Sequence, residues 1–225
     1  MKTICRTEGE KTYFIIADAD VVYLDTIREL EFQQVEDGFA KTFPAATMHM
    51  DTIYQNFARH AEELILQTAG IHPVPWEQAL LALIQRIEQR QDINWLLVGS
   101  TALAVRGIEV SPRDIDLVLD DVGAHQVGDL LSDYLIEPVQ DSRGWISNWF
   151  GRAFLHARVE WIGGVDANID SDEVTDYGPM AASRLETINW RGYKLQVPPL
   201  DLQLQVSERR GLAERVKKIR NARFI

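Results

Sequence analysis

The chain has 225 residues, a length that suits one large domain or two small ones. Its 46% hydrophobic and 25% charged residues are typical of a soluble globular protein and exclude wholesale disorder. The 34 acidic and 23 basic residues give a net charge of −11, so we expect no DNA partner.

Three further features of the sequence indicate the cellular compartment in which we expect the protein. The single cysteine, Cys5, excludes an intrachain disulfide framework and fits a reducing environment. No apolar run approaches the roughly 18 residues that a membrane-spanning helix needs. The first 14 residues contain no apolar signal core. We therefore expect a cytoplasmic protein with no membrane partner.

The clearest boundary lies at residues 70–75, where one glycine and two prolines interrupt two helical patterns. It predicts a small N-terminal α/β unit over residues 1–72, followed by a domain over residues 73–225. Residues 13–24 are rich in Ile, Val and Tyr and predict a strand or hairpin arm. Residues 51–68 place apolar side chains at helical spacing and predict an amphipathic helix.

The second domain alternates helical and strand patterns. A helix over 76–91 is followed by a buried strand over 95–98, and a short helix over 101–106 precedes a strand over 114–120. The remaining predictions are a helix over 124–135, a strand over 154–162, a hairpin over 185–197 and a final helix over 201–221. The order predicts a mixed α/β (α+β) fold.

One pair of motifs carries chemistry. The run Val98-Gly99-Ser100 is followed, after thirteen residues, by Asp114-Ile115-Asp116-Leu117. Side chains at i and i+2 of a strand share a face about 6.5–7 Å apart, so the two aspartates project together. Oxygen ligands of this kind suit Mg²⁺ or Mn²⁺ with substrate phosphates. A glycine at the start of a helix lets the backbone approach an anion closely. This combination is what phosphoryl or nucleotidyl transfer requires.

These residues resemble the signature of the nucleotidyltransferase superfamily that includes DNA polymerase beta. The resemblance covers about residues 76–221 and is strongest to small stand-alone members. Those are the aminoglycoside and lincosamide nucleotidyltransferases and the nucleotidyltransferase toxins of abortive-infection and toxin–antitoxin systems. It implies a nucleotidyltransferase-fold mixed sheet flanked by helices, behind the small N-terminal α/β unit.

The resemblance also implies a catalytic and metal-binding set. Asp114 and Asp116 would hold the metal ions, and Glu160 on a later strand would complete the site or act as a base. Alternation places His156, Arg158 and Glu160 on one face of that strand. Asp166 is the second choice for the third carboxylate, because the glycines at 163 and 164 indicate that the strand has ended.

The implied nucleotide-binding residues are Gly99, Ser100, Arg113 and Lys217. Arg106 and Arg113 flank the signature and are both candidates for a phosphate contact, although an exposed arginine is the default interpretation of each. Residues 208–225 carry seven basic residues against two glutamates. This basic helix would either neutralise a triphosphate or complement its own dipole and the acidic body.

The implied reaction is Mg²⁺- or Mn²⁺-dependent transfer of a nucleoside monophosphate from a nucleoside triphosphate to an acceptor hydroxyl. A small-molecule acceptor is favoured because the body is acidic, with tRNA or protein as alternatives. A homodimer is compatible with so small a site. A catalytically silent nucleotide- or partner-binding module is the second hypothesis. The third is a phosphatase using Asp18, because residues 14–22 resemble the nucleophile motif of haloacid-dehalogenase phosphatases.

Overall fold

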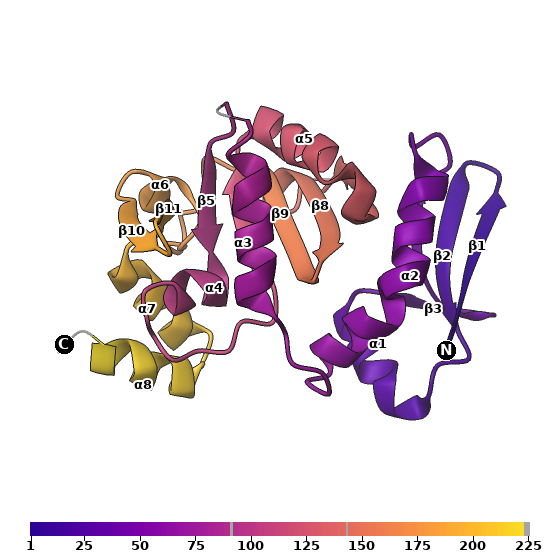
Figure 1. The fold of residues 1–225 in the computed structure, drawn as a ribbon, viewed down its shortest axis with the longest axis horizontal. Helices are drawn as coiled ribbons and strands as arrows, with labels where there is room; N and C mark the ends of the chain where they lie inside the picture. Colours follow the sequence, from indigo (N-terminus) through magenta and orange to yellow (C-terminus); the bar gives the residue numbers. More distant parts are fainter. Residues whose placement is uncertain (91, 143, 223–225) are drawn as a thin grey trace.

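The computed structural model describes residues 1–222 except residues 91 and 143. Its N-terminal part is a four-stranded antiparallel sheet in the order β1-β2-β4-β3, with helices packed beside it (Figure 1). The strands are β1 (Lys2–Glu8), β2 (Lys11–Ala17), β3 (Gln33–Val35) and β4 (Gly38–Pro44). The helices are a 3₁₀ turn (Val21–Tyr23), α1 (Leu24–Glu29) and the long α2 (Met50–Thr68).

The centre of the molecule is a five-stranded mixed sheet in the order β5-β6-β9-β8-β7. Strands β6 and β9 run parallel, and the other neighbours run antiparallel. The strands are β5 (Trp95–Val98), β6 (Ile115–Leu119), β7 (Leu135–Asp141), β8 (Ser147–Leu155) and β9 (Ala157–Val165). Helix α3 (Trp76–Ile87) precedes these strands in the chain, and α4 (Gly99–Ala104), α5 (Asp121–Leu130) and a 3₁₀ turn (Ser132–Tyr134) lie between them.

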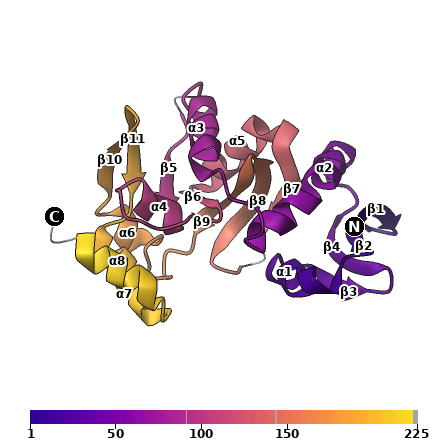
Figure 2. The ribbon, with the colours of Figure 1, turned by 60° about the horizontal axis from the view of Figure 1, so that its bottom comes forward.

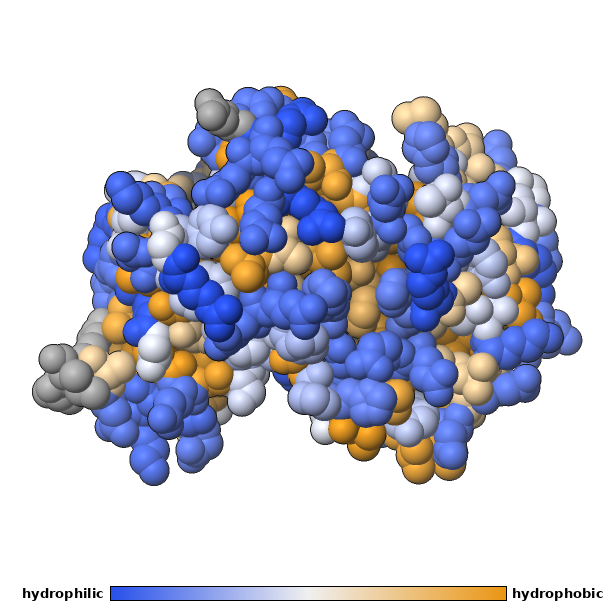
Figure 3. Space-filling view, viewed as in Figure 1, coloured by the Kyte–Doolittle hydropathy of each residue, from blue (hydrophilic) through white to orange (hydrophobic). Residues whose placement is uncertain are grey.

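The C-terminal elements lie at the end of the molecule opposite the N-terminal sheet (Figure 2). They are the short α6 (Pro179–Ala182), the hairpin β10 (Glu186–Trp190) and β11 (Tyr193–Val197), then α7 (Leu200–Arg209) and α8 (Ala213–Ala222). A small apolar cluster ties α4 to the two last helices through Leu103, Leu204 and Ile219. The face seen in Figure 3 is largely hydrophilic, with apolar side chains exposed in small separate patches. No helix of the described residues is both long and apolar enough to cross a membrane.

A single apolar core joins the N-terminal part to the central sheet. It runs from Phe14 in β2 and Phe57 in α2 to Leu83 in α3 and Trp161 in β9, each no more than 2% exposed. Burying large apolar side chains is the main driving force of folding, and here both parts contribute to the same cluster. The division at residue 72 therefore stays a prediction.

Several predicted elements are confirmed. The helix over 51–68 is α2, the strand over 95–98 is β5, and the hairpin over 185–197 is β10 and β11. The helix expected over 76–91 is α3, which ends at Ile87, and residue 91 lies outside the described part of the chain. Residue 223, counted in the basic C-terminal run, also lies outside it.

For other predicted elements, the predicted boundaries were wrong. The strand expected over 13–24 ends at Ala17, because Asp18 takes a positive φ of 52° and Asp20 caps a 3₁₀ turn. The strand expected over 154–162 is two strands, separated at His156, whose φ is 63°. His156 therefore lies in a turn, outside the strand face that Arg158 and Glu160 share. The helix expected over 201–221 is broken at Gly211, where φ is 67°.

Strand β9 also continues through Gly163 and Gly164 to Val165, although the two glycines were read as its end. The reason for Gly163 is packing. A Cβ there would lie 2.4 Å from the Cβ of Ala124 in α5, so only glycine lets the helix approach the sheet this closely.

Candidate active site

A row of charged residues crosses the central sheet at one register position. Asp116 in β6 lies opposite Glu160 in β9, Glu160 opposite Arg152 in β8, and Arg152 opposite Glu137 in β7. Directly paired residues of neighbouring strands project from the same face, so the four side chains are neighbours. The row therefore consists of two acidic residues, one arginine and a third acidic residue, on four neighbouring strands.

Helix α5 covers the opposite face. Trp161 follows Glu160 in β9, and its Nε1–H donates to the carbonyl oxygen of Ala124 in α5 at 3.0 Å. Successive strand residues point to opposite faces, so the charged row faces away from α5.

The structure brings together the three carboxylates predicted from the sequence. One oxygen each from Asp114, Asp116 and Glu160 lie within 4.8 Å of one another. Asp114 immediately precedes β6, two residues before Asp116, and the Thr101 hydroxyl donates to its carbonyl oxygen at 2.6 Å. Helix α4 therefore fixes the backbone from which Asp114 projects.

The electrostatics of Asp116 fit a cation site. Burial first, and then the negative charges of Asp114 and Glu160, raise the pKa of Asp116 well above its ordinary value. A divalent cation among the three would remove this repulsion, and carboxylate oxygens are the ligands that Mg²⁺ and Mn²⁺ prefer. The donor set therefore fits a divalent cation.

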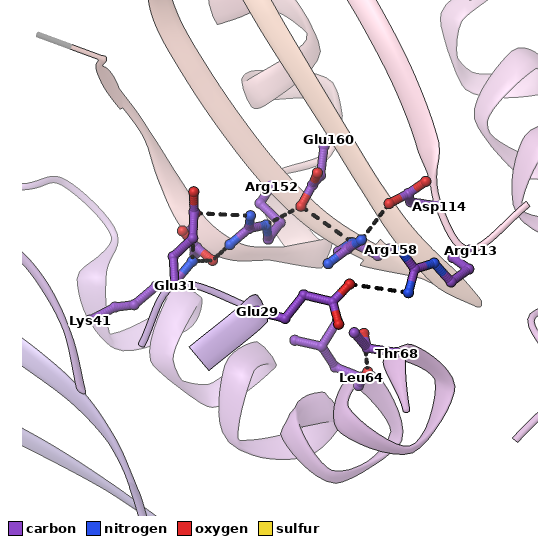
Figure 4. Close-up of polar contacts among 11 residues, drawn as sticks. Glu29, Glu31, Lys41, Leu64, Thr68, Arg113, Asp114, Arg152, Arg158 and Glu160 are labelled. Atoms are coloured by element: carbon purple, nitrogen blue, oxygen red, sulfur yellow. Dashed lines mark hydrogen bonds and ion pairs between the residues drawn. The ribbon is translucent and has the colours of Figure 1, made fainter. Parts of the chain in front are cut away.

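Two arginines hold the same carboxylates from the side (Figure 4). Arg158 Nη2 donates to Asp114 Oδ2, and its Nε lies 3.3 Å from Glu160 Oε1. Arg152 Nε donates to the same Glu160 Oε1 at 2.5 Å. Asp114 Oδ1 and Glu160 Oε2 take no part in these contacts, which leaves each residue an oxygen to offer to a cation.

These arginines also decide what Glu160 can do. Burial alone would raise its pKa, but the charges of Arg152 and Arg158 outweigh burial and lower it. A carboxylate with a lowered pKa is a weak base near neutral pH. The geometry therefore favours the role of ligand for Glu160 over the role of general base.

Gly99 lies directly against Asp116. Its φ is 67°, and a Cβ at this position would lie 2.3 Å from Asp116 Oδ2. Gln203 Nε2 in α7 donates to the Gly99 carbonyl oxygen at 3.1 Å and holds the turn from the other side. Glycine is therefore required here by both conformation and space.

A cavity of about 390 Å³ opens beside Asp116 and Glu160. The end of α7 and the start of α8 contribute three arginines to its lining, and three aromatic side chains also line it. These residues are Arg209, Arg210, Arg215, Trp145, Phe150 and Tyr177. Carboxylates and guanidinium groups therefore line the same space, whose volume is one that small ligands occupy.

Three of the residues predicted to bind nucleotide are not among those that line this cavity. Ser100 is buried and is not among the residues that line the cavity. Arg113 is 58% exposed and forms an ion pair with Glu29 of α1 at 3.1 Å. Lys217 lines a separate surface hollow with Arg220. The break at Gly211 changes the phase of the helix, so Arg215 faces the cavity in place of Lys217.

Three other predictions on single residues also change. Arg106 is not exposed: it forms an ion pair with Glu186 at 2.6 Å and donates to the Pro198 carbonyl oxygen, tying α4 to the β10–β11 hairpin. Asp166 accepts a hydrogen bond from the Asn168 backbone and does not line the cavity. Asp18 follows β2 in an antiparallel sheet, whereas the phosphatase interpretation requires a doubly wound parallel sheet.

Sequence reasoning missed several charged residues of the site. Asp176 lines the cavity; burial raises its pKa, although Arg210 and Arg215 oppose the rise. It lies in an irregular segment between β9 and α6, where no periodicity marks it. Arg152 and Glu137 were missed because the register between β7, β8 and β9 cannot be read from the sequence.

No family model and no curated protein matches the chain. Two solved structures are similar to it. One is a Thermotoga maritima protein described as a "putative nucleotidyltransferase", 21% identical, with a TM-score of 0.50, covering 65% of this chain and 91% of its own. The other is a lincosamide antibiotic adenylyltransferase with lincomycin bound, 14% identical, with a TM-score of 0.46, covering 67% of this chain and 99% of its own.

The chain therefore has the nucleotidyltransferase fold, as the signature predicted. Its central sheet carries the signature glycine at the end of β5 and the aspartate pair at β6, and its third carboxylate is on the neighbouring strand β9.

Proposed function

We propose that this protein is a nucleotidyltransferase that moves a nucleoside monophosphate from a nucleoside triphosphate to an acceptor hydroxyl. The observation that carries the proposal is the grouping of Asp114, Asp116 and Glu160. Asp116 and Glu160 also line, with Gly99 and three arginines, one cavity. A fold shared with a nucleotidyltransferase raises the expectation but does not by itself assign the activity.

Each group has a role in this proposal. The three carboxylates would hold Mg²⁺ or Mn²⁺, and the metal would supply charge neutralisation and polarisation of the phosphate that is transferred. Gly99 leaves room for the Asp116 carboxylate, because a Cβ at this position would lie 2.3 Å from Asp116 Oδ2. Arg210 and Arg215 line the same cavity as Asp116 and Glu160 and bind the phosphates that leave as pyrophosphate.

The acceptor in this proposal is a small molecule. The cavity volume of about 390 Å³ and the aromatic side chains of Trp145, Phe150 and Tyr177 suit a compact organic molecule. The net charge of −11 repels a long polyanion. Incubation with α-labelled nucleotide and separate pools of small hydroxyl compounds, tRNA and protein distinguishes the acceptors, and label on tRNA or protein would contradict this choice.

A thermal-shift titration tests nucleotide binding. The four ribonucleoside triphosphates are each added with and without Mg²⁺. A ligand at 100 times its Kd stabilises by about 2.7 kcal/mol, which is roughly 5–10 °C for a chain of this size. We expect one nucleotide to give a Mg²⁺-dependent rise of this size, and Asp116→Asn to abolish it.

Asp129→Asn is the matched control, because Asp129 is exposed on α5, which covers the opposite face of the sheet. It should keep the full shift. An equal shift in Asp116→Asn and the unaltered protein would refute the proposed site.

A catalytically silent nucleotide- or partner-binding module is the second candidate, and one observation favours it. Arg158 already pairs with both Asp114 and Glu160, so part of their charge is compensated by the chain itself. A pyrophosphate-release assay separates the two. An enzyme releases pyrophosphate in the presence of its acceptor, whereas a silent module shows the thermal shift and no release.

A further inference from the structure

The N-terminal part of the chain reaches the candidate active site through buried charges. Lys41 in β4 is 8% exposed, and its Nζ donates to Glu137 Oε1 in β7 at 2.7 Å. Glu31, which follows α1, lies 3.6 Å from the same Nζ and 3.4 Å from Arg152 Nη2. Two N-terminal side chains therefore contact the charged row of the central sheet.

Arg152 connects these contacts to Glu160. Each of its three nitrogens has a different acidic partner: Nη1 binds Glu137, Nη2 lies near Glu31, and Nε donates to Glu160 Oε1 (Figure 4). A guanidinium is a planar, rigid fork, so fixing two of its nitrogens fixes the direction of the third. The direction in which Arg152 Nε points is thus set from the side of Lys41 and Glu137.

We propose that Lys41 is a positioning residue for Glu160, which assigns a role to the first 72 residues; this inference rests on the proposed function. Lys41 holds Glu137, and Glu137 and Glu31 orient Arg152. Arg152 then holds Glu160 by Oε1 and so fixes the carboxylate of Glu160 beside Asp114 and Asp116. A partner that contacts a metal ligand directly, as Arg152 contacts Glu160, typically changes metal affinity or activity 10- to 100-fold when it is removed, and Lys41 acts through that partner.

A second contact from the N-terminal part lies next to Asp114, another of the three carboxylates. Glu29 of α1 pairs with Arg113, the residue before Asp114, at 3.1 Å. Buried ion pairs are a poor source of stability, because apolar residues of similar volume often stabilise as well or better. A role in geometry accounts for a buried lysine at the end of a row that leads to a candidate metal ligand.

The experiment measures Mn²⁺ binding to the full chain without nucleotide, by electron paramagnetic resonance of the free aquo ion. The main variant is Lys41→Met with Glu137→Gln, which removes the link and leaves the net charge unchanged. Removing both partners of a buried pair is far less disruptive than removing one. We expect this double variant to bind Mn²⁺ at least about 10-fold more weakly than the unaltered protein.

The single variant Lys41→Met tests whether Mn²⁺ binding becomes tighter or weaker. Loss of a positive charge alone would tighten cation binding, whereas loss of positioning weakens it, so weaker binding supports the inference. Lys41→Arg should retain the Mn²⁺ affinity, because it keeps the charge and a donor. Lys11→Met in the adjacent strand β2 is the matched control, since Lys11 is exposed and should leave the affinity unchanged.

If the contact between Lys41 and Glu137 only stabilises the fold, the double variant will unfold at a lower temperature but will keep the Mn²⁺ affinity of the unaltered protein. This result would overturn the inference. Tighter binding by Lys41→Met would overturn it as well. Asp116→Asn separates the two proposals. Binding that depends on Asp116 but not on Lys41 overturns the inference alone, whereas binding that is indifferent to Asp116 overturns the proposed metal site and the inference together.

Discussion

The Asp116 carboxylate packs so closely against Gly99 that no residue larger than glycine fits at position 99. The left-handed φ of 67° and the close approach to Asp116 Oδ2 are separate demands on the same residue. The sequence indicated a glycine beside a ligand, but the actual neighbour is one of the signature carboxylates. Each half of the signature therefore constrains the other.

Gly99→Ala should cost both stability and cation binding. The left-handed conformation alone costs an alanine about 1–3 kcal/mol. The added Cβ also pushes the Asp116 carboxylate aside, so Mn²⁺ binding should weaken. Chemical denaturation and Mn²⁺ titration measure the two effects.

Gly107→Ala is the control, because its φ is 83° and nothing lies within 4 Å of the added Cβ. It should lose stability and keep its Mn²⁺ affinity. Equal Mn²⁺ affinities for the two alanine variants would contradict the close contact at Gly99.

At the level of secondary structure, local sequence patterns predicted the strands and helices better than they predicted which strands pair with one another. The aspartate pair of β6 is visible within a few residues, and alternation in β9 marks Glu160. Glu160 is held by Arg152 from β8, and Arg152 in turn contacts Glu137 from β7, where the register between the two strands shifts irregularly. Pairing between strands depends on the folded core, so no local pattern could reveal Arg152 and Glu137.

The break between α7 and α8 shows the same limit in a helix. The basic run predicted one helix and assigned Lys217 to the phosphates. The left-handed turn at Gly211 rotates the second half, so that Arg215 lines the cavity and Lys217 does not. A glycine inside a helical pattern lowers confidence in continuity, and here it ends one helix.

Arg215→Gln should weaken nucleotide binding, while Lys217→Gln should leave it nearly unchanged. A charge-assisted hydrogen bond contributes about 1.5–3 kcal/mol, which corresponds to roughly 10- to 100-fold in Kd. Isothermal titration with the nucleotide identified by thermal shift measures both variants. A larger effect at Lys217 would favour the interpretation based on sequence over the geometry of the cavity.

In the whole molecule, the N-terminal part and the central sheet share one apolar core and the buried contact between Lys41 and Glu137. The sequence predicted two units from a glycine and two prolines, which mark a turn between helices and say nothing of what packs across it. Shared burial couples the two parts energetically, because separating them would expose apolar surface on both.

We therefore expect residues 1–72 and the remainder to unfold in one cooperative transition. All six tryptophans lie at or after residue 76, so their fluorescence reports on the second part alone, whereas far-ultraviolet circular dichroism reports on the whole chain. In a two-state transition the two probes give coincident denaturation curves. A dichroism change that precedes the fluorescence change would mean that the N-terminal sheet unfolds independently, and Lys41 would then be held too weakly to position Glu160. Coincident curves that shift together in Lys41→Met would show that both parts gain stability from the same contact.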